Sequence, residues 1–350
     1  MNRRNFVKTS VMATSLSGFN ILHESSKAEN DPSIIGHNTH KYKVVKGWGI
    51  LDAGKNPVND CHEMVEDAQG RLIMVTNETK NNIIIYDKSG KLLDTWGDNY
   101  IGGHGLTITN EGGEQFLFIC DPERHQVIKT DLKGRELMII DYPKESGVYA
   151  YPTKFKPTES SINPVNGDIY VADGYGSNYV MQYDRNGKYI QHFGGYSPLH
   201  TNEQFDCCHG VLVDTRSAPY SLLITDRRNN CLKRFTLEGK YLDTYTLPGS
   251  YICRPVMHGD YTFGAVFRSG NDAWNYSGYI QILDKNMKAI STPGGTEPIY
   301  IDGQLQKQFK YDPINAFMHP HDVYIDSDEN IYIPQWASQK TYPVKLERIA

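Results

Sequence analysis

Long apolar runs, a basic patch and paired cysteine motifs are all missing from this sequence of 350 residues. Beyond the N-terminus, no stretch approaches the roughly 18 consecutive apolar residues that a membrane-spanning helix requires. We therefore expect no transmembrane span in the mature protein. Acidic residues outnumber basic ones, 41 to 36, and the formal net charge is −5. Without a basic patch, the chain is not expected to bind nucleic acid.

Cysteine is scarce, and its spacing does not indicate a metal knuckle. None of the six cysteines belongs to a Cys-x-x-Cys pair. A chain of this length can build a sizeable core without disulfide staples. We expect mostly small buried residues, with one bridge possible, at Cys61, Cys120, Cys207, Cys208, Cys231 and Cys253.

The first 28 residues have the features of an export signal, which we predict to be a twin-arginine-type signal peptide. Residues 2–8 are similar to the twin-arginine motif, residues 11–22 are mildly apolar, and residues 26–28 form a small-x-small cleavage site. A basic disordered N-terminus is the alternative. Twin-arginine export would carry a folded, metal-loaded protein to the periplasm or the extracellular space. Removal of this segment would leave 32 basic and 40 acidic residues, a net charge of about −8.

Apolar alternation recurs in pairs of short runs, and the same order returns about every 42 to 60 residues. The paired runs cover 71–76 and 82–87, 115–120 and 126–131, 168–172 and 179–184, and 221–225 and 231–235. After each second run comes a turn in which Gly precedes Lys or Arg, and then a third run. Because glycine accepts the positive φ of tight hairpin turns, these turns predict antiparallel neighbours.

With a further strand in front, each unit has four antiparallel strands, which is typical of a propeller blade, since one blade cannot bury both of its own faces. The sequence predicts an all-β, six-bladed β-propeller over residues 41–350, after a linker at 29–40. Residues 41–51 would supply the outer strand that the last blade lacks and so close the ring. A β-helix and two β-sandwiches are the alternatives. The six units begin near His62, His104, Thr153, His209, His258 and His321.

Three units share a histidine at the start of their first strand. The stretch Met318–Ile325 carries His321, followed by Asp322 and alternating apolar residues, and His104 and His209 occupy the same place in blades two and four. The first strand of a blade lines the channel, and alternate blades of six are related by about 120°, so the three imidazoles would point at one axial site. Three neutral imidazoles with an open fourth position are typical of a catalytic zinc. The alternative is three hydrogen-bonded channel residues without metal.

Four further residues could act beside these histidines. His62 heads blade one, outside the alternation, and is either a substrate contact or structural. Asp322 could bind a hard cation such as Ca²⁺, orient a histidine or cap a turn. Tyr175 and Arg227 follow the second strands of blades three and four. These segments could be plain turns, or they could bring a general acid or base and a carboxylate clamp over the channel mouth.

The ordered motifs resemble the NHL-repeat propeller of peptidyl-α-hydroxyglycine α-amidating lyase, the zinc lyase that completes C-terminal amidation of peptides. The similarity covers most of residues 60–345. It is carried by the three histidine segments, by Asp-Gly-Tyr at 173–175 and by Asp-Arg at 226–227. The family's reaction cleaves the C–N bond of an α-hydroxyglycine to give an amide and glyoxylate. The resemblance implies zinc ligands His104, His209 and His321, a base Tyr175, an active-site arginine Arg227 and a calcium ligand Asp322.

Some positions depart from the family pattern. Gly176 stands where the family has a disulfide cysteine, and Leu223 and Arg234 replace the other bridged pair, so neither family disulfide can form. His319 stands where the family has a methionine in the metal loop. The family's blade-one arginine has no equivalent that the sequence identifies.

We therefore expect an exported, monomeric zinc enzyme of the amidating-lyase type, with calcium as a candidate second metal. It would cleave a C–N or C–O bond in a small-molecule or peptide substrate that is oxygenated and bears a carboxylate. One alternative is a non-catalytic NHL propeller that binds a carbohydrate, peptide or protein. Another is a calcium-dependent propeller enzyme that acts on sugars or lactones. The predicted substrate-binding residues are Arg227, His62 and His319.

Overall fold

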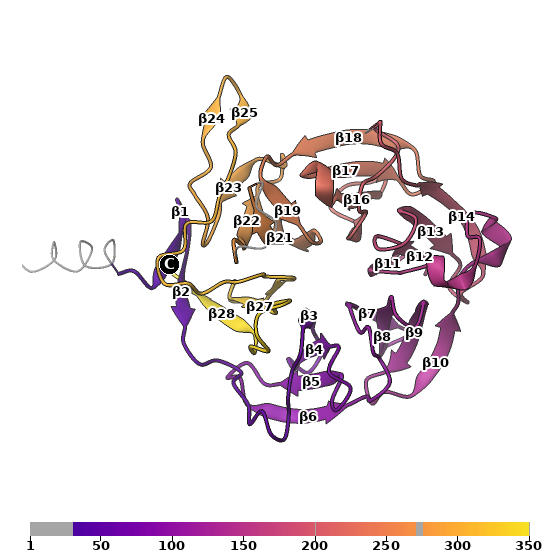
Figure 1. Cartoon of the computed structure of the whole chain (residues 1–350), viewed down its shortest axis with the longest axis horizontal. Coiled ribbons are helices and arrows are strands. Elements are labelled where there is room, and N and C mark those ends of the chain that lie inside the picture. Colours follow the sequence, from indigo (N-terminus) through magenta and orange to yellow (C-terminus); the bar gives the residue numbers. More distant parts are fainter. Residues whose placement is uncertain (1–30, 200, 271–275, 350) are drawn as a thin grey trace, which may run out of the picture.

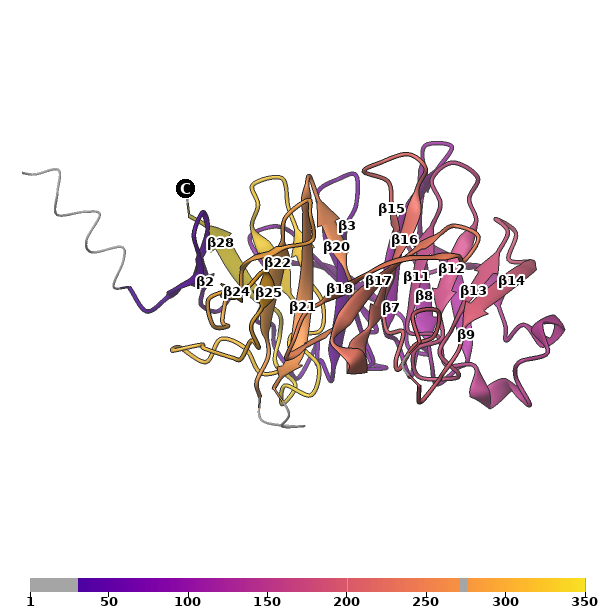
Figure 2. The same ribbon diagram turned by 90° about the horizontal axis from the view of Figure 1, so that it is seen from above.

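Six small antiparallel sheets surround a central channel in the computed structural model (Figure 1). The structure describes residues 31–199, 201–270 and 276–349, so the predicted signal peptide lies outside the described residues. The described chain is nearly all β, which confirms the predicted six-bladed propeller. Seen from the side, the ring is a flat body with loops at both faces (Figure 2). Within the described ranges, no helix is long and apolar enough to cross a membrane.

Blades one to four each contain four consecutive strands, with the first strand innermost. Blade one comprises β3 (Cys61–Glu66), β4 (Leu72–Thr76), β5 (Ile83–Tyr86) and β6 (Leu92–Trp96). Blade two comprises β7 (Gly105–Glu111), β8 (Glu114–Asp121), β9 (Gln126–Asp131) and β10 (Glu136–Ile140). Blade three comprises β11 (Glu159–Ile162), β12 (Ile169–Ala172), β13 (Tyr179–Tyr183) and β14 (Tyr189–Gly194). Blade four comprises β15 (Val211–Asp214), β16 (Ser221–Asp226), β17 (Cys231–Thr236) and β18 (Tyr241–Thr246).

Blade six joins the two ends of the propeller. Its inner strands are β26 (Tyr324–Ile325), β27 (Ile331–Ile333) and β28 (Val344–Arg348), and its outer strands are β2 (His40–Val45) and β1 (Ile34–His37). The pairing of β2 with β28 confirms that an N-terminal strand closes the ring. Strand β1 falls inside residues 29–40, which we predicted as a linker. It pairs with β2 through the hairpin at Asn38 and Thr39, so the blade begins at Ile34.

Blade five begins earlier than its predicted start at His258. Its inner edge consists of β19 (Ser250–Ile252) and β20 (Val256–His258), which both pair with β21 (Tyr261–Ser269); β22 (Tyr279–Leu283) and β23 (Ala289–Ser291) follow outward. The ladder is interrupted between β19 and β20, where Pro255 has no N–H to donate. The segment from Ser250 to Arg254 therefore lies at the end of the inner edge that is near His209, and His258 lies at the opposite end.

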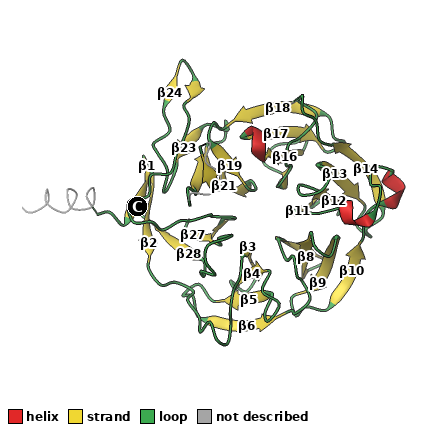
Figure 3. Cartoon of the chain, in the orientation of Figure 1, coloured by secondary structure: helices red, strands yellow, loops and turns green. Residues whose placement is uncertain are grey.

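Blade three also begins at a different residue from the predicted Thr153. That threonine lies in η2 (Pro152–Lys154), and the first strand starts at Glu159. Two other short 3-10 helices occur, η1 (Lys144–Ser146) and η3 (Arg227–Asn229) (Figure 3). The long connection after β23 contains a small hairpin of β24 (Tyr300–Ile301) and β25 (Gln304–Leu305), which projects from the ring (Figure 1).

The core is divided into clusters that lie between neighbouring blades. Val65 and Ile73 of blade one, for example, pack with Leu106 and Leu117 of blade two. Each blade covers the apolar face of the next, so burial requires the complete ring. All six cysteines are buried and free, which confirms that they serve as small core residues. The single disulfide that the sequence allowed is not formed.

Candidate functional site

The imidazoles of His104, His209 and His321 converge at one mouth of the channel. Their ring centroids are 4.6 Å apart for His104 and His321, 4.9 Å for His104 and His209, and 5.0 Å for His209 and His321. All three side chains are buried. Each precedes the first strand of an even-numbered blade, and the near-equal separations follow from the approximate symmetry of the ring.

One nitrogen of each histidine is held by the backbone of the next blade. Nδ1 lies 2.8 Å from the Thr158 carbonyl oxygen for His104, 3.0 Å from that of Cys253 for His209, and 3.1 Å from that of His62 for His321. A carbonyl oxygen can only accept, so each Nδ1 carries the proton. Each Nε2 is left with a lone pair, as in histidines that bind metal through Nε2.

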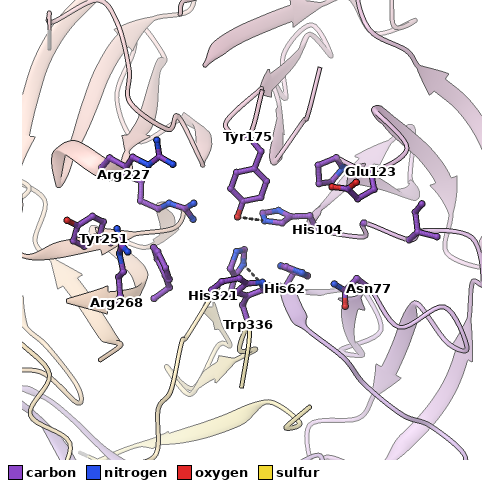
Figure 4. A pocket seen from close by; sticks show the side chains of 15 residues that line it. His62, Asn77, His104, Glu123, Tyr175, Arg227, Tyr251, Arg268, His321 and Trp336 are labelled. Carbon is purple, nitrogen blue, oxygen red and sulfur yellow. Dashed lines mark hydrogen bonds between the residues drawn. The ribbon is translucent and has the colours of Figure 1, made fainter. Parts of the chain in front are cut away.

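The Tyr175 hydroxyl lies between two of these lone pairs. Its oxygen is 3.2 Å from Nε2 of His104 (Figure 4). The same oxygen is 3.1 Å from Nε2 of His209. The phenol has one hydrogen, so it can donate to only one of the two nitrogens. Among the described residues, Nε2 of His321 is buried without any hydrogen-bond partner. Three electron-pair donors and one available proton make this point a site that favours a cation.

Burial keeps the histidines neutral. It lowers the pKa of His104, His209 and His321 well below the ordinary value, and the nearby cations and imidazoles act in the same direction. Tyr175 is 41% exposed as a whole residue, but desolvation of its hydroxyl beside the histidines raises its pKa to about 12, and the Arg227 guanidinium opposes that rise. At neutral pH the site therefore contains neutral imidazoles and a protonated phenol.

Two more side chains contribute candidate ligand atoms. His62, His104 and His321 each offer an atom within 4.8 Å of the others, and so do His209, Cys253 and His321. The His62 ring is 4.5 Å from that of His104, and burial lowers the pKa of His62 to about 4. Cys253 was not predicted because we began blade five at His258. Correct strand register in blade five would have placed this cysteine beside the histidines.

Arg227 reaches over the mouth from η3, which directly follows β16. Its guanidinium carbon lies 5.4 Å from the Tyr175 ring centre and 4.7 Å from the Phe267 ring centre. The backbone N–H of Arg227 donates to the Cys207 carbonyl at 3.0 Å, which fixes the turn against the fourth blade's histidine segment. The structure thus brings together both predicted catalytic residues, Tyr175 and Arg227, next to the histidines.

A cavity of about 390 Å³ at the mouth is lined by His62, His104, Tyr175, Arg227 and His321 (Figure 4). The lining also includes residues that the sequence motifs did not single out: Asn77, Glu123, Arg228, Tyr251, Phe267, Arg268 and Trp336. Arg268 lies near the end of β21 in blade five. In blade four, Asp226 and Arg227 stand at the end of the corresponding strand, β16. Comparison of the blades in correct register could have found it.

His319 and Asp322, two further predicted site residues, lie away from the cavity. His319, which we predicted to bind substrate, is not among the described residues that line it. It is buried against Trp336 and Tyr276, at ring separations of 5.7 and 5.2 Å. Asp322, the predicted calcium ligand, points into the channel beneath the histidines. Its carboxylate accepts two hydrogen bonds from Arg254, at 2.7 and 2.8 Å.

No protein-family model matches the chain. Over 262 residues it is 25% identical to peptidyl-glycine alpha-amidating monooxygenase A of Xenopus laevis, covering 73% of this chain and 26% of the relative. It is also 26% identical over 167 residues to a probable peptidyl-alpha-hydroxyglycine alpha-amidating lyase of Caenorhabditis elegans, covering 47% of this chain and 45% of that protein. The chain thus spans about a quarter of the length of the monooxygenase.

A solved streptogramin B lyase has the same fold, with a TM-score of 0.54. The alignment covers 90% of this chain and 97% of the lyase, at 15% sequence identity. Identity at this level carries the propeller architecture and no further assignment.

Proposed function

We propose that this chain, a six-bladed β-propeller that resembles the peptidyl-α-hydroxyglycine α-amidating lyases, is an exported zinc-dependent lyase. Its substrate would be a small molecule or peptide terminus with a hydroxyl and a carboxylate on the carbon whose C–N or C–O bond is cleaved. The observation that carries the proposal is the convergence of three neutral imidazoles and the Tyr175 hydroxyl beneath Arg227.

The donor set fits zinc. His104, His209 and His321 would hold the ion through Nε2, because each Nδ1 is already engaged with a carbonyl oxygen. The buried Nε2 of His321, without a partner among the described residues, supports this assignment. A bound zinc would supply Lewis acidity toward the substrate oxygen.

Tyr175 would move the proton of the substrate hydroxyl. Its pKa of about 12 makes the phenol a weak acid, and the Arg227 guanidinium favours the phenolate form. A protonated phenol cannot take up this proton, so Tyr175 would act as the phenolate, the form that the Arg227 guanidinium favours and that a cation held by the histidines would favour further. Transfer of the hydroxyl proton to this phenolate would allow the C–O bond to become a carbonyl as the neighbouring C–N bond breaks. The same proton can then pass to the leaving nitrogen, so an α-hydroxyglycine would give an amide and glyoxylate without a net change in protons.

The arginines above the mouth would bind the substrate carboxylate. Arg227 and Arg268 both line the cavity, and their guanidinium carbons lie 4.7 and 5.4 Å from the Phe267 ring centre. Guanidinium groups bind carboxylates in a bidentate manner, and a ring beside them limits their hydration. The resemblance to the amidating lyases leads one to expect a second active-site arginine from blade one, which this sequence does not supply. Arg268 of blade five would take its place as the second positive charge at the carboxylate.

Metal analysis and an activity assay test this proposal together. We expect about one zinc per purified chain, consistent with one ion per set of three imidazoles, and release of glyoxylate from a peptide ending in α-hydroxyglycine. His209→Ala should lose both, whereas His258→Ala, a histidine at the far end of blade five, should retain both.

Two results would contradict it. Wild-type protein without stoichiometric zinc, with His209→Ala indistinguishable from it, would remove the metal site and favour a binding propeller. Glyoxylate release that does not exceed that of a metal-stripped control would leave the zinc site standing but exclude the α-hydroxyglycine substrate.

A further inference from the structure

The channel beneath the histidines contains a second layer of side chains from the same strand starts. The residue that follows each mouth residue points to the opposite side of its strand, down the channel. In blade order these six residues are Glu63, Gly105, Glu159, Gly210, Arg254 and Asp322. Four of them, Glu63, Glu159, Arg254 and Asp322, form what we term the channel cluster.

Arg254 is at the centre of the channel cluster. Its Nε and Nη2 donate to the two oxygens of Asp322, at 2.7 and 2.8 Å. Its Nη1 lies 3.1 Å from an oxygen of Glu63 and 3.1 Å from an oxygen of Glu159. One guanidinium thus bridges carboxylates from blades one, three and six.

The carboxylate oxygens have further partners from the backbone. The N–H of Met64 donates to Asp322 at 3.0 Å, the N–H of Leu106 to Glu63 at 2.6 Å, and the N–H of Ser160 to Glu159 at 2.8 Å. Calcium binds six to eight oxygens at 2.3 to 2.6 Å. Here the guanidinium occupies the centre of the available carboxylates, so the calcium predicted at Asp322 does not fit the residues present.

The neighbouring strand is shaped around the arginine. Gly210 lies beside Arg254, and a Cβ added to Gly210 would lie 2.5 Å from both Cα and Cβ of Arg254. Only glycine leaves space for the Arg254 backbone and stem at this point.

We propose that Arg254 is the resident cation of this channel. It neutralises the buried carboxylates and links their blades, as a structural divalent metal would, so the propeller does not depend on calcium. A covalently attached cation cannot be removed by chelators or dilution, unlike a bound calcium ion. Arg254 directly follows Cys253, and the Cys253 carbonyl oxygen orients His209. By holding this segment in place, Arg254 also helps to position that histidine. This inference does not depend on the lyase assignment, because its readouts are stability and calcium binding.

Thermal unfolding of protein stripped of metal beforehand, with and without added calcium chloride, tests the proposal. Because both samples lack zinc, loss of an ion from the histidines does not affect the comparison, and the wild-type melting temperature should be the same in both. Arg254→Ala leaves three buried carboxylates without their cation, and the loss of one partner of a buried ion pair lowers the melting temperature by on the order of 10 °C in the absence of calcium. Calcium should restore part of this loss, and calorimetry should detect calcium binding to the variant but not to the wild type.

Two further variants keep the result decisive. Arg216→Ala removes an arginine that pairs with Asp214 in blade four, and it should gain no response to calcium. Arg254→Lys retains a positive charge, so it should fold without a calcium response even if Arg254→Ala does not fold. Calcium that remains bound stoichiometrically to dialysed wild-type protein, or that raises its melting temperature by several degrees, would overturn the proposal. So would an Arg254→Ala variant whose melting temperature equals that of the wild type.

Discussion

At the scale of single residues, the site has more hydrogen-bond acceptors than donors. The hydroxyl of Tyr175 faces Nε2 of His104 and of His209, and both nitrogens are unprotonated because their Nδ1 atoms donate to carbonyls. One proton cannot satisfy two lone pairs. A cation at this point would satisfy them both.

Tyr175→Phe separates metal binding from proton transfer. The variant should retain zinc, because the three imidazoles and their carbonyl partners are unchanged. Its kcat for glyoxylate release should fall by roughly a hundredfold to ten-thousandfold, the range for loss of a general acid or base. Tyr241→Phe is the matched control, since that hydroxyl forms its hydrogen bond with Thr244 on the outer strand of blade four, away from the cavity. Unchanged kcat in Tyr175→Phe would exclude the tyrosine from proton transfer.

At the scale of strands, the inner strand of each blade has two functions that alternate along the chain. The residue at the mouth carries an imidazole, a thiol or a hydroxyl, and the next residue carries a carboxylate, a guanidinium or only hydrogen. Because consecutive side chains of a strand point in opposite directions, the histidine site and the channel cluster are built by neighbouring positions at the same strand starts. His321 is followed by a member of the cluster, Asp322, whereas His104 and His209 are each followed by glycine. An error of register in one blade would therefore disturb both.

Gly210→Ala tests how closely the fourth and fifth blades are fitted. The added methyl group would contact the Arg254 backbone at 2.5 Å and the Cys253 carbonyl oxygen at 2.7 Å. Overpacking of this kind costs about 1 to 3 kcal/mol of unfolding free energy, which urea titration would measure. Zinc affinity should weaken too, because the Cys253 carbonyl orients His209.

Gly54→Ala is the control for that measurement. Its added methyl group would meet only the end of the exposed Asp52 side chain, at 3.2 Å. Equal stability of the two alanine variants would show that the blades can separate to admit the methyl group.

At the scale of the whole molecule, the ring is closed by hydrogen bonds between strands from opposite ends of the chain. Strand β2 pairs with β28, and Tyr42 on β2 is fully buried in a cluster that includes Phe263 of blade five and Leu346 of blade six. The N-terminal strands therefore complete both the last sheet and the core beside it.

Tyr42→Ala should lower the unfolding free energy by about 3 to 5 kcal/mol, as for other large buried aromatic residues. Lys43→Ala, on the exposed side of the same strand, should change it by no more than about 0.5 kcal/mol. Denaturant unfolding compares the two. If both variants unfold at the wild-type midpoint, β2 does not contribute to closure of the ring.

The sequence alone determined the architecture and the three histidines. Alternating apolar runs, glycine turns and a repeated unit are local signals, so they identify four-stranded blades and count six of them. The histidines were found in the same way, because they stand at equivalent positions of His-headed units. Tyr175 and Arg227 were proposed from the turns that follow the second strands of blades three and four, and the likeness to the amidating lyases agreed with that choice. The structure places both beside the histidines.

Only the tertiary structure decided which side chains face one another across the channel. Blade five has an interrupted inner strand at Pro255, so its start at Cys253 and Arg254 has no local signal, and both residues were missed. Asp322 was correctly placed near the channel, yet its partner is 68 positions away in the sequence. Periodicity reports which face of a strand a residue occupies. Which charge meets it from another blade depends on the closure of the ring, which no local pattern contains.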